Sequence, residues 1–174
     1  MHQGLPAIAR SDARVVILGT LPGPLSLEKS QYYAKQNNAF WKIMGELVGA
    51  SSDVPDERAE LLRQNGIALW DVYAAAAREG SDDSNIEATG AQVNDFTAFL
   101  AAHPKIRLIC FNGQPAAAAF EKLVVPRLPP IFREIPRRTL PSTSAAYAAM
   151  PFSEKLRIWR AALEQAGVLP LPFG

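Results

Sequence analysis

Short apolar runs alternate with longer amphipathic segments along this chain. Residues 14–19, 66–72 and 106–111 are rich in aliphatic side chains, several of them β-branched, and each run is bounded by polar residues, glycine or proline. Runs of this length and composition predict strands that are buried on both faces. A shorter fourth strand is predicted around residues 138–140, after a proline-rich passage.

Apolar residues recur every three or four positions in the intervals between these runs. This spacing predicts helices over residues 39–48, 92–102, 114–124 and 152–166. A further, charged helix is predicted after Pro55. The prolines at positions 22 and 24 predict a loop after the first strand. The polar residues 80–90 predict a second, ordered loop.

Strands separated by helices favour parallel pairing with right-handed crossovers. We therefore expect an α/β fold, a three-layer α/β/α sandwich with a short, mostly parallel four-stranded central sheet, formed by residues 1–174 as a single domain. In such sheets the ligand crevice lies outside the carboxyl ends of the strands. The loops after Gly19, Phe111 and Leu140 should meet there.

Composition narrows the class of protein. The 174 residues hold 18 basic and 17 acidic side chains, and 48% of the chain is hydrophobic. The chain has no run of 18 apolar residues, so no membrane-spanning helix is predicted. No secretory signal is recognised either. We therefore expect a cytoplasmic protein with no membrane partner. One cysteine and two histidines predict neither an internal disulfide nor a closed zinc site.

The charges are unevenly distributed along the chain. Residues 96–174 hold ten basic and four acidic side chains, whereas residues 46–95 hold three basic and eleven acidic ones. A polyanion could bind one face of such a protein, although scattered surface charge would give the same counts. The sequence has no phosphate-binding loop, no dinucleotide fingerprint and no nucleophile elbow, which argues against nucleotide-triphosphate, dinucleotide and serine-hydrolase sites.

Four segments in order carry a family resemblance. They are Gly19-Thr-Leu-Pro-Gly-Pro-Leu-Ser26, Gln31-Tyr-Tyr-Ala-Lys-Gln-Asn-Asn-Ala-Phe-Trp-Lys42, Phe111-Asn112-Gly113 and Leu140-Pro-Ser-Thr-Ser144. Together they resemble the uracil-DNA glycosylase superfamily, and most closely its hypoxanthine-DNA (deoxyinosine) glycosylase branch. The resemblance runs from about Arg14 to the last helix. It implies a monomeric base-excision repair enzyme that needs no cofactor and no metal, acts on DNA containing deaminated bases, and is associated with the nucleoid if bacterial.

The resemblance also assigns residues. Gly19, Thr20, Leu21 and Pro22 form the first motif of the substrate pocket, and Asn38 matches the catalytic asparagine of the deoxyinosine branch. A neutral amide can orient water or donate a hydrogen bond to the departing base. The alternative for Asn38 is a simple helix N-cap.

Two further residues match base-binding positions. Phe40 corresponds to the aromatic ring on which the extruded base stacks, and Asn112 to the amide that reads the hydrogen-bonding edge of the base. From the residues alone, Phe40 could equally be a core aromatic of an amphipathic helix. Asn112 could equally belong to an Asn-Gly turn or a helix cap.

The late loop matches the motif that presses against the duplex in this superfamily. Its hydroxyls and backbone amides suit phosphate oxygens, and a basic residue stands just upstream. The expected DNA-binding residues are Pro141, Ser142, Thr143, Ser144 and Arg138. An ordinary polar turn is the alternative.

The sequence departs from the superfamily pattern at Leu21, where many uracil glycosylases have Asp or Asn to activate water. This favours the deoxyinosine branch, and no lysine matches a Schiff-base position, so we expect a monofunctional DNA-deoxyinosine/uracil glycosylase. Residues 145–147 also differ from the usual second motif. Two alternatives stay open: a mismatch-specific uracil/thymine glycosylase and a non-catalytic damaged-DNA-binding protein.

Overall fold

In the computed structural model, which describes residues 1–80 and 83–171, a four-stranded parallel sheet forms the centre of the protein. The strand order is β3-β2-β6-β7. All three pairings are parallel. The strands are β2 (Val15–Gly19), β3 (Ile67–Asp71), β6 (Leu108–Asn112) and β7 (Arg137–Leu140). All five β2 residues are buried, as expected for a strand covered on both faces.

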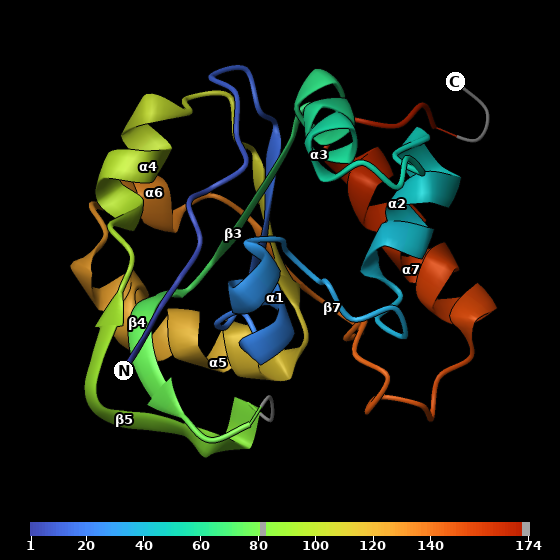
Figure 1. The fold of residues 1–174 in the computed structure, drawn as a ribbon. Coiled ribbons are helices and arrows are strands. Elements are labelled where there is room, and N and C mark those ends of the chain that lie inside the picture. The colour runs from blue at the N-terminus through green and yellow to red at the C-terminus, as the bar shows by residue number, and fades with distance from the viewer. Residues whose placement is uncertain (81–82, 172–174) are drawn as a thin grey trace.

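Helices cover both faces of this sheet (Figure 1). On one side lie α2 (Phe40–Val48), α3 (Pro55–Gln64) and α7 (Phe152–Gln165). On the other lie α4 (Phe96–Ala102), α5 (Gln114–Leu123) and the short α6 (Pro130–Arg133). The predicted three-layer α/β/α fold is therefore confirmed.

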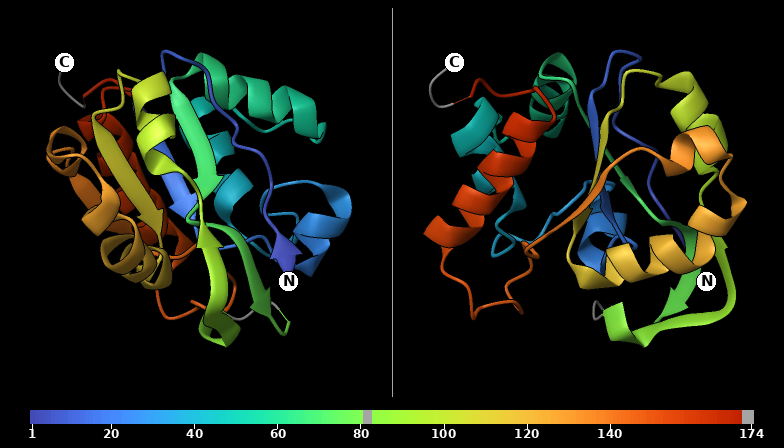
Figure 2. Two further views of the ribbon diagram at one scale, coloured as in Figure 1. Left: turned by 90° about the vertical axis from the view of Figure 1, so that its left-hand side faces the viewer. Right: turned by 180° about the vertical axis from the view of Figure 1, so that it is seen from behind.

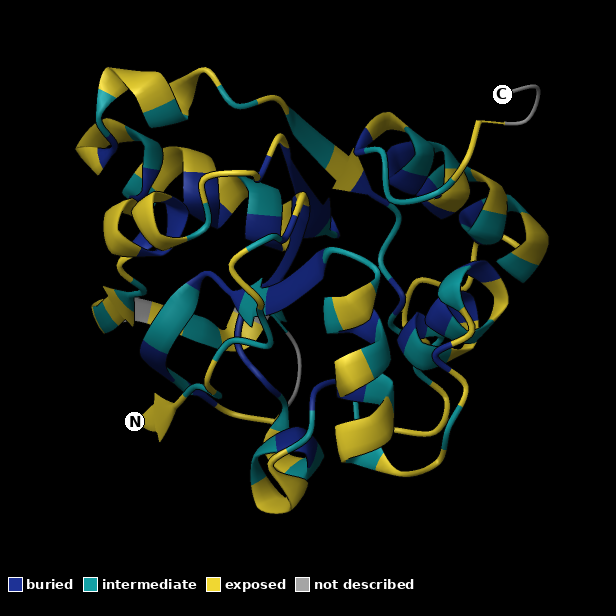
Figure 3. Cartoon of the chain, turned by 90° about the horizontal axis from the view of Figure 1, so that it is seen from above, coloured by how far each residue is buried: buried dark blue, intermediate teal, exposed yellow. Residues whose placement is uncertain are grey.

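The apolar core is divided by the sheet into two clusters. One packs Phe40, Ile43 and Trp159 against alternate side chains of β2, and the other packs Phe96, Phe99 and Phe120 against the opposite set. The buried residues follow the sheet and the inner faces of the helices (Figure 3). None of the helices in the described part of the chain is long and apolar enough to span a membrane.

A second sheet was not predicted from the sequence. Strands β1 (His2–Gln3), β4 (Tyr73–Arg78) and β5 (Ile86–Val93) pair antiparallel, and Figure 2 shows β4 and β5 extending beyond the end of the central sheet. The expected loop over 80–90 was therefore wrong for residues 86–90, while residues 81–82 lie outside the described part. The helix expected from residue 92 begins at Phe96 because β5 continues to Val93.

Short helical segments also replace parts of the expected loops. Helix α1 (Pro24–Lys29) begins at a proline, which suits the first turn because the missing N–H is not needed there. Single 3₁₀ turns occur at Asp83–Asn85 and Val125–Arg127. The loops after β2, β6 and β7 nevertheless converge at the carboxyl edge of the sheet, as expected.

Candidate active site

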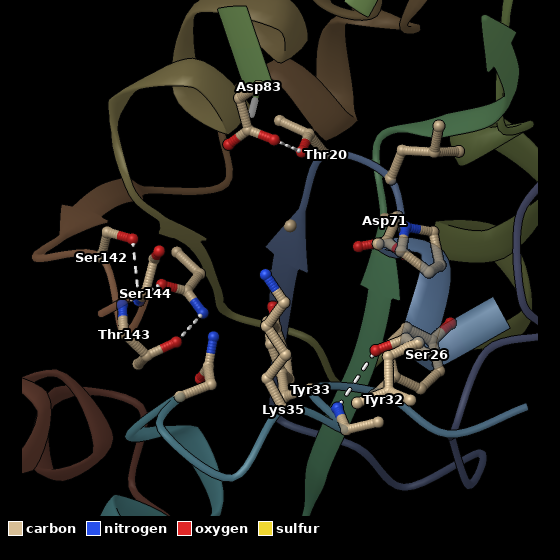
Figure 4. Close-up of a pocket in the computed structure, with 18 of the residues that line it drawn as sticks. Thr20, Ser26, Tyr32, Tyr33, Lys35, Asp71, Asp83, Ser142, Thr143 and Ser144 are labelled. Atoms are coloured by element: carbon tan, nitrogen blue, oxygen red, sulfur yellow. Dashed lines mark hydrogen bonds between the residues drawn. The ribbon is translucent and has the colours of Figure 1, made fainter. Parts of the chain in front are cut away.

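A hollow of about 150 Å³ lies at the carboxyl edge of the central sheet. Its walls come from the loop after β2, the segment before α2, and the ends of β3, β6 and β7 (Figure 4). A cavity of about this volume holds a single benzene ring in other proteins. The described lining residues are Gly19, Thr20, Leu21, Pro22, Gly23, Leu25, Ser26, Tyr32, Tyr33, Ala34, Lys35, Asn38, Asp71, Arg78, Asp83, Asn112, Ser142, Thr143 and Ser144.

Asn38 lines this hollow immediately before α2. Its Oδ1 accepts a hydrogen bond from the backbone N–H of Phe40 at 3.0 Å. The N-cap residue itself is Ala39, which supplies no side-chain bond. Asn38 thus takes over part of the capping role with its oxygen, and its Nδ2 makes no hydrogen bond to the residues that the structure describes. The two expected roles of Asn38 therefore do not exclude one another.

Asn112 and the late loop are joined directly. The Asn112 Nδ2 donates to Thr143 Oγ1 at 2.9 Å, and its Oδ1 accepts the Thr143 backbone N–H at 2.9 Å. The Thr143 carbonyl in turn accepts the backbone N–H of Ala39 at 2.9 Å. Three of the sequence motifs are therefore held together through one threonine, and Asn112 keeps a second N–H for a ligand.

The first motif is fixed by a buried arginine from the second sheet. Arg78 Nη2 donates to the carbonyls of Leu21 and Pro22 at 3.2 and 2.6 Å, and its Nη1 pairs with Asp83 at 3.2 Å. The Asp83 carboxylate also accepts from Thr20 Oγ1 at 2.6 Å. Gly19, Thr20, Leu21 and Pro22 all line the hollow, as expected.

Asp71 contributes a carboxyl group that the sequence did not assign to the site. It ends β3, pairs in register with Gly19, and is only 4% exposed. Burial raises its pKa to about 7, the nearby Asp83 carboxylate adds to the rise, and Arg78 opposes it. Its Oδ2 is buried with no hydrogen-bond partner among the described residues. The hollow therefore contains one carboxyl group that can change protonation near neutral pH.

The aromatic rings of Phe40 and Tyr33 are stacked. Phe40 is fully buried in the core and is not among the described residues that line the hollow. The Tyr33 ring covers it, with ring centroids 4.4 Å apart and planes inclined by 24°. In this structure Tyr33, not Phe40, therefore presents its ring to the hollow.

The late loop reaches the hollow only in part. Ser142, Thr143 and Ser144 line it, but Pro141 and Arg138 do not appear among the described lining residues. The Pro141 carbonyl accepts from Trp159 Nε1 at 3.0 Å, which anchors the loop on α7. Arg138 donates to the Gln165 side chain at 2.8 Å. Arg138 is thereby placed beside the end of α7.

Sequence reasoning assigned no role in the site to Tyr33, Asp71, Arg78 or Asp83. Asp71 could have been found from its position at the carboxyl end of a buried strand, at the edge where the ligand crevice is expected. The other three reach the hollow through loop conformation and the unpredicted second sheet. Within residues 1–80 and 83–171, no cluster of three or more His, Cys, Asp or Glu side chains could hold a metal ion.

Comparison with known proteins decides the family. A sequence model of the uracil DNA glycosylase superfamily matches residues 6–167. The chain belongs to this superfamily. The match spans the central sheet, both helical layers and all the motifs around the hollow.

The relatives of this uracil DNA glycosylase superfamily member have names that specify a base or an activity. A protein of Methanosarcina acetivorans named hypoxanthine DNA glycosylase is 40% identical over 118 residues, covering 67% of this chain and 73% of that protein. A protein of the same name from Methanosarcina barkeri is 37% identical over 114 residues, covering 64% and 71%. The solution NMR structure of a candidate uracil DNA glycosylase from Methanosarcina acetivorans superposes with a TM-score of 0.77 at 34% identity, covering 95% of this chain and 98% of that one.

Proposed function

We propose that this monofunctional DNA glycosylase removes deaminated bases, hypoxanthine first and uracil second, from nucleotides rotated out of DNA. The names of its Methanosarcina relatives support hypoxanthine as the base. The observation that carries the proposal is the placement of two neutral amides, Asn38 and Asn112, around one hollow at the carboxyl edge of the sheet.

The proposed reaction is hydrolysis of the N-glycosidic bond. As the bond breaks, negative charge develops on the base and positive charge on the sugar; water then supplies the hydroxyl at C1′, and its remaining proton neutralises the released base. Asn38 stabilises the departing base because its Nδ2 can donate to a ring nitrogen or carbonyl oxygen, while its Oδ1 stays bonded to Phe40 N–H. Donors that are already oriented act most strongly where water is excluded.

Base selection is assigned to Asn112. Its orientation is fixed by Thr143, so its second Nδ2–H has one direction in which to donate. Hypoxanthine and uracil carry a lactam edge, a carbonyl next to an N–H, and that carbonyl can accept from Asn112. Leu21, in contrast, offers no side-chain group to activate water, which disfavours the mismatch-specific uracil/thymine alternative.

DNA is the proposed partner, with residues 141–144 gripping the phosphates that flank the extruded nucleotide. The hydroxyl groups of Ser142 and Ser144 are suitable donors to phosphate oxygens, whereas the Ser144 backbone N–H is already donated to Ser142 Oγ. We place Arg138 at the outer part of this contact. We further propose that residues 1–174 act as one glycosylase domain, as a monomer, in the cytoplasm.

Excision from defined duplexes tests this function. Oligonucleotides with a single hypoxanthine, uracil or guanine-opposed thymine are incubated with the protein and then treated with alkali to cleave abasic sites. Cleavage at hypoxanthine, with slower cleavage at uracil, is the expected result. Predominant release of guanine-opposed thymine would establish the mismatch alternative instead, and tight binding without abasic sites would establish the non-catalytic one.

Two alanine variants locate the chemistry. Asn38→Ala should lower the single-turnover rate by 100-fold or more, about the cost of losing one oriented donor. Asn37→Ala is the matched control, because Asn37 is exposed and is not among the described lining residues. Equal rates for the two variants would contradict the catalytic role of Asn38.

A further inference from the structure

Thr20 carries a hydroxyl group at the point where the first motif leaves β2. The residue is 7% exposed, and its Oγ1 lies 2.6 Å from Oδ1 of Asp83 (Figure 4). Its carbonyl accepts the backbone N–H of Tyr73 at 3.0 Å, which joins Thr20 to the first residue of β4. Both Thr20 and Asp83 line the hollow. The hydroxyl is therefore held in a fixed place at the wall of the hollow.

The Asp83 carboxylate determines the direction of this hydrogen bond. A carboxylate accepts hydrogen bonds and donates none, and this one also pairs with the Arg78 guanidinium at 3.2 Å. Thr20 must therefore donate its single hydroxyl proton to Asp83. The lone pairs of Oγ1 remain, so the Thr20 side chain can only accept a hydrogen bond from a group in the hollow.

Few groups of an extruded, deaminated nucleotide could donate to such an oxygen. The sugar ring oxygen, the phosphate oxygens and the base carbonyl are all acceptors, and none of them can pair with the Thr20 hydroxyl in this orientation. Two donors remain, a water molecule and the lactam N–H of the base. A water that donates one hydrogen to Oγ1 keeps a lone pair with which to attack C1′.

The first motif offers the attacking water no other polar side chain. Of its four residues, only Thr20 has one, and Leu21 is apolar and 5% exposed. The carbonyls of Leu21 and Pro22 already accept from Arg78 at 3.2 and 2.6 Å. Because both amides of the hollow are assigned to the base, the Thr20 hydroxyl is the group of this wall that suits the water.

We propose that Thr20 holds the attacking water by accepting one of its hydrogens, and that Asp83 is a positioning residue that keeps the Thr20 hydroxyl proton away from the water. This inference rests on the proposed function. The water oxygen forms its bond to C1′ as the C1′–N bond breaks, and the electron pair of the broken bond leaves with the base. The proton that the water loses neutralises the base. Thr20 keeps its own proton and stays neutral throughout.

The surroundings of Asp83 indicate that this contact can be removed without unfolding the protein. Asp83 belongs to the 3₁₀ turn before β5, and its side chain is 36% exposed, whereas that of Arg78 is 2% exposed. Without the Thr20 hydroxyl, the carboxylate would remain paired with Arg78 and partly hydrated. We therefore expect variants at positions 20 and 83 to fold, and their effects to appear in the reaction rate.

Thr20→Val keeps the shape of the side chain and removes the hydroxyl. Its single-turnover rate on a hypoxanthine duplex should fall about 10- to 100-fold, because the water is no longer oriented. Thr20→Ser restores the hydroxyl and should recover most of the rate. Thr97→Val is the matched control, since Thr97 is exposed on α4 and is not among the described lining residues.

The affinity for the duplex separates a water-holding role from a base-reading one. It is measured in the Asn38→Ala background, in which the base stays uncleaved. If Thr20 holds the water, Thr20→Val should leave this affinity unchanged and should slow the release of hypoxanthine and uracil by the same factor. Weaker binding would assign Thr20 to the lactam N–H instead, and an unchanged rate would show that it holds no water. Either result would overturn the proposal.

A double-mutant cycle tests the positioning role of Asp83. Asp83→Asn should slow release by about tenfold in the wild-type protein and cause no further loss beside Thr20→Val, because it acts through the hydroxyl. Equal losses in the two backgrounds would overturn this role. If Thr20→Val does not fold, Asp83→Asn alone decides: slower release at unchanged affinity supports the proposal, and an unchanged rate overturns it. Failure of the wild-type enzyme to release any base would instead contradict the proposed function itself.

Discussion

The side-chain amide of Asn112 holds Thr143 at both ends, donating to its hydroxyl and accepting its backbone N–H, each at 2.9 Å. An amide has nearly the same shape in its two flipped orientations, and only its hydrogen-bond partners decide between them. The two hydrogen bonds to Thr143 fix the orientation of the Asn112 amide. The strand end and the late loop are therefore fixed to one another, and the second N–H of Asn112, which we propose reads the base, has a defined direction.

Thr143→Val should lower excision of hypoxanthine by about 10- to 100-fold. The variant keeps the backbone N–H but removes the hydroxyl that holds Nδ2, and small misplacements at a reacting centre cost rates of this size. Single-turnover rates on hypoxanthine and adenine duplexes measure the effect, and the ratio of the two should fall. Thr139→Val, on the exposed side of β7, should change neither rate. A loss of stability without a loss of selectivity would contradict the orienting role.

Asp71→Asn should change how stability depends on pH. Burial raises the pKa of Asp71 from 3.8 to about 7, so the folded state binds the proton more tightly than the unfolded state. The contribution of Asp71 to the free energy of unfolding is complete below pH 4 and is lost as the pH rises from 4 through 7. A pKa shift of this size corresponds to a loss on the order of 4 kcal/mol in the free energy of unfolding above pH 7. The amide cannot ionise and should retain its stability over this range.

Urea unfolding at pH 4.5, 6 and 8 measures this difference. The wild-type protein should lose stability relative to Asp71→Asn as the pH increases. Asp56→Asn is a suitable control because Asp56 is exposed at the start of α3, and its curve should stay parallel to that of the wild type. Parallel curves for Asp71→Asn as well would mean that Asp71 is ionised throughout.

Arg78→Met should destabilise the protein by about 3 kcal/mol. The change leaves the carbonyls of Leu21 and Pro22 without their donor and Asp83 without its ion-pair partner. Chemical denaturation measures the loss. Arg157→Met removes an arginine from an exposed pair with Glu154 on α7 and should have little effect. Equal stability of the two variants would show that the first motif does not depend on Arg78.

Lys155→Met should weaken DNA binding several-fold. Lys155 is buried and donates from Nζ to the Tyr147 carbonyl at 2.7 Å, which anchors the loop after Ser144. Because this lysine touches no phosphate in the proposed complex, the slope of log affinity against log salt should stay unchanged. Lys122→Met, an exposed lysine on α5, controls for the loss of charge. A reduced salt slope for Lys155→Met would indicate direct phosphate contact instead.

The layers of this fold were predictable because its central strands are short apolar runs between amphipathic helices. The second sheet was not predictable in the same way. The alanines of β4 suit a helix as well as a strand, and the polar residues of β5 show no clear alternation. Only the pairing of these strands with one another and with β1 makes them a sheet.

Some residues of the candidate site could likewise be predicted from the sequence and others could not. Asn38, Asn112 and Thr143 could be predicted because they follow recognisable motifs in the sequence. Tyr33 also lies in one of these motifs, but the direction of its side chain could not be predicted, since it depends on a left-handed backbone that the neighbouring residues do not signal. Asp71 becomes part of the site through its register with Gly19, a tertiary relationship that two separated apolar runs do not specify.

Leu21 is buried, and its backbone carbonyl accepts a hydrogen bond from Arg78. Converting this enzyme toward water-activating relatives by Leu21→Asp alone would crowd a third acid into a hollow already containing Asp71 and Asp83. Mutual repulsion would keep one of the three protonated and so inactive as a base. A successful redesign must exchange positions 21 and 71 together, transferring the negative charge from one loop to the other without increasing it.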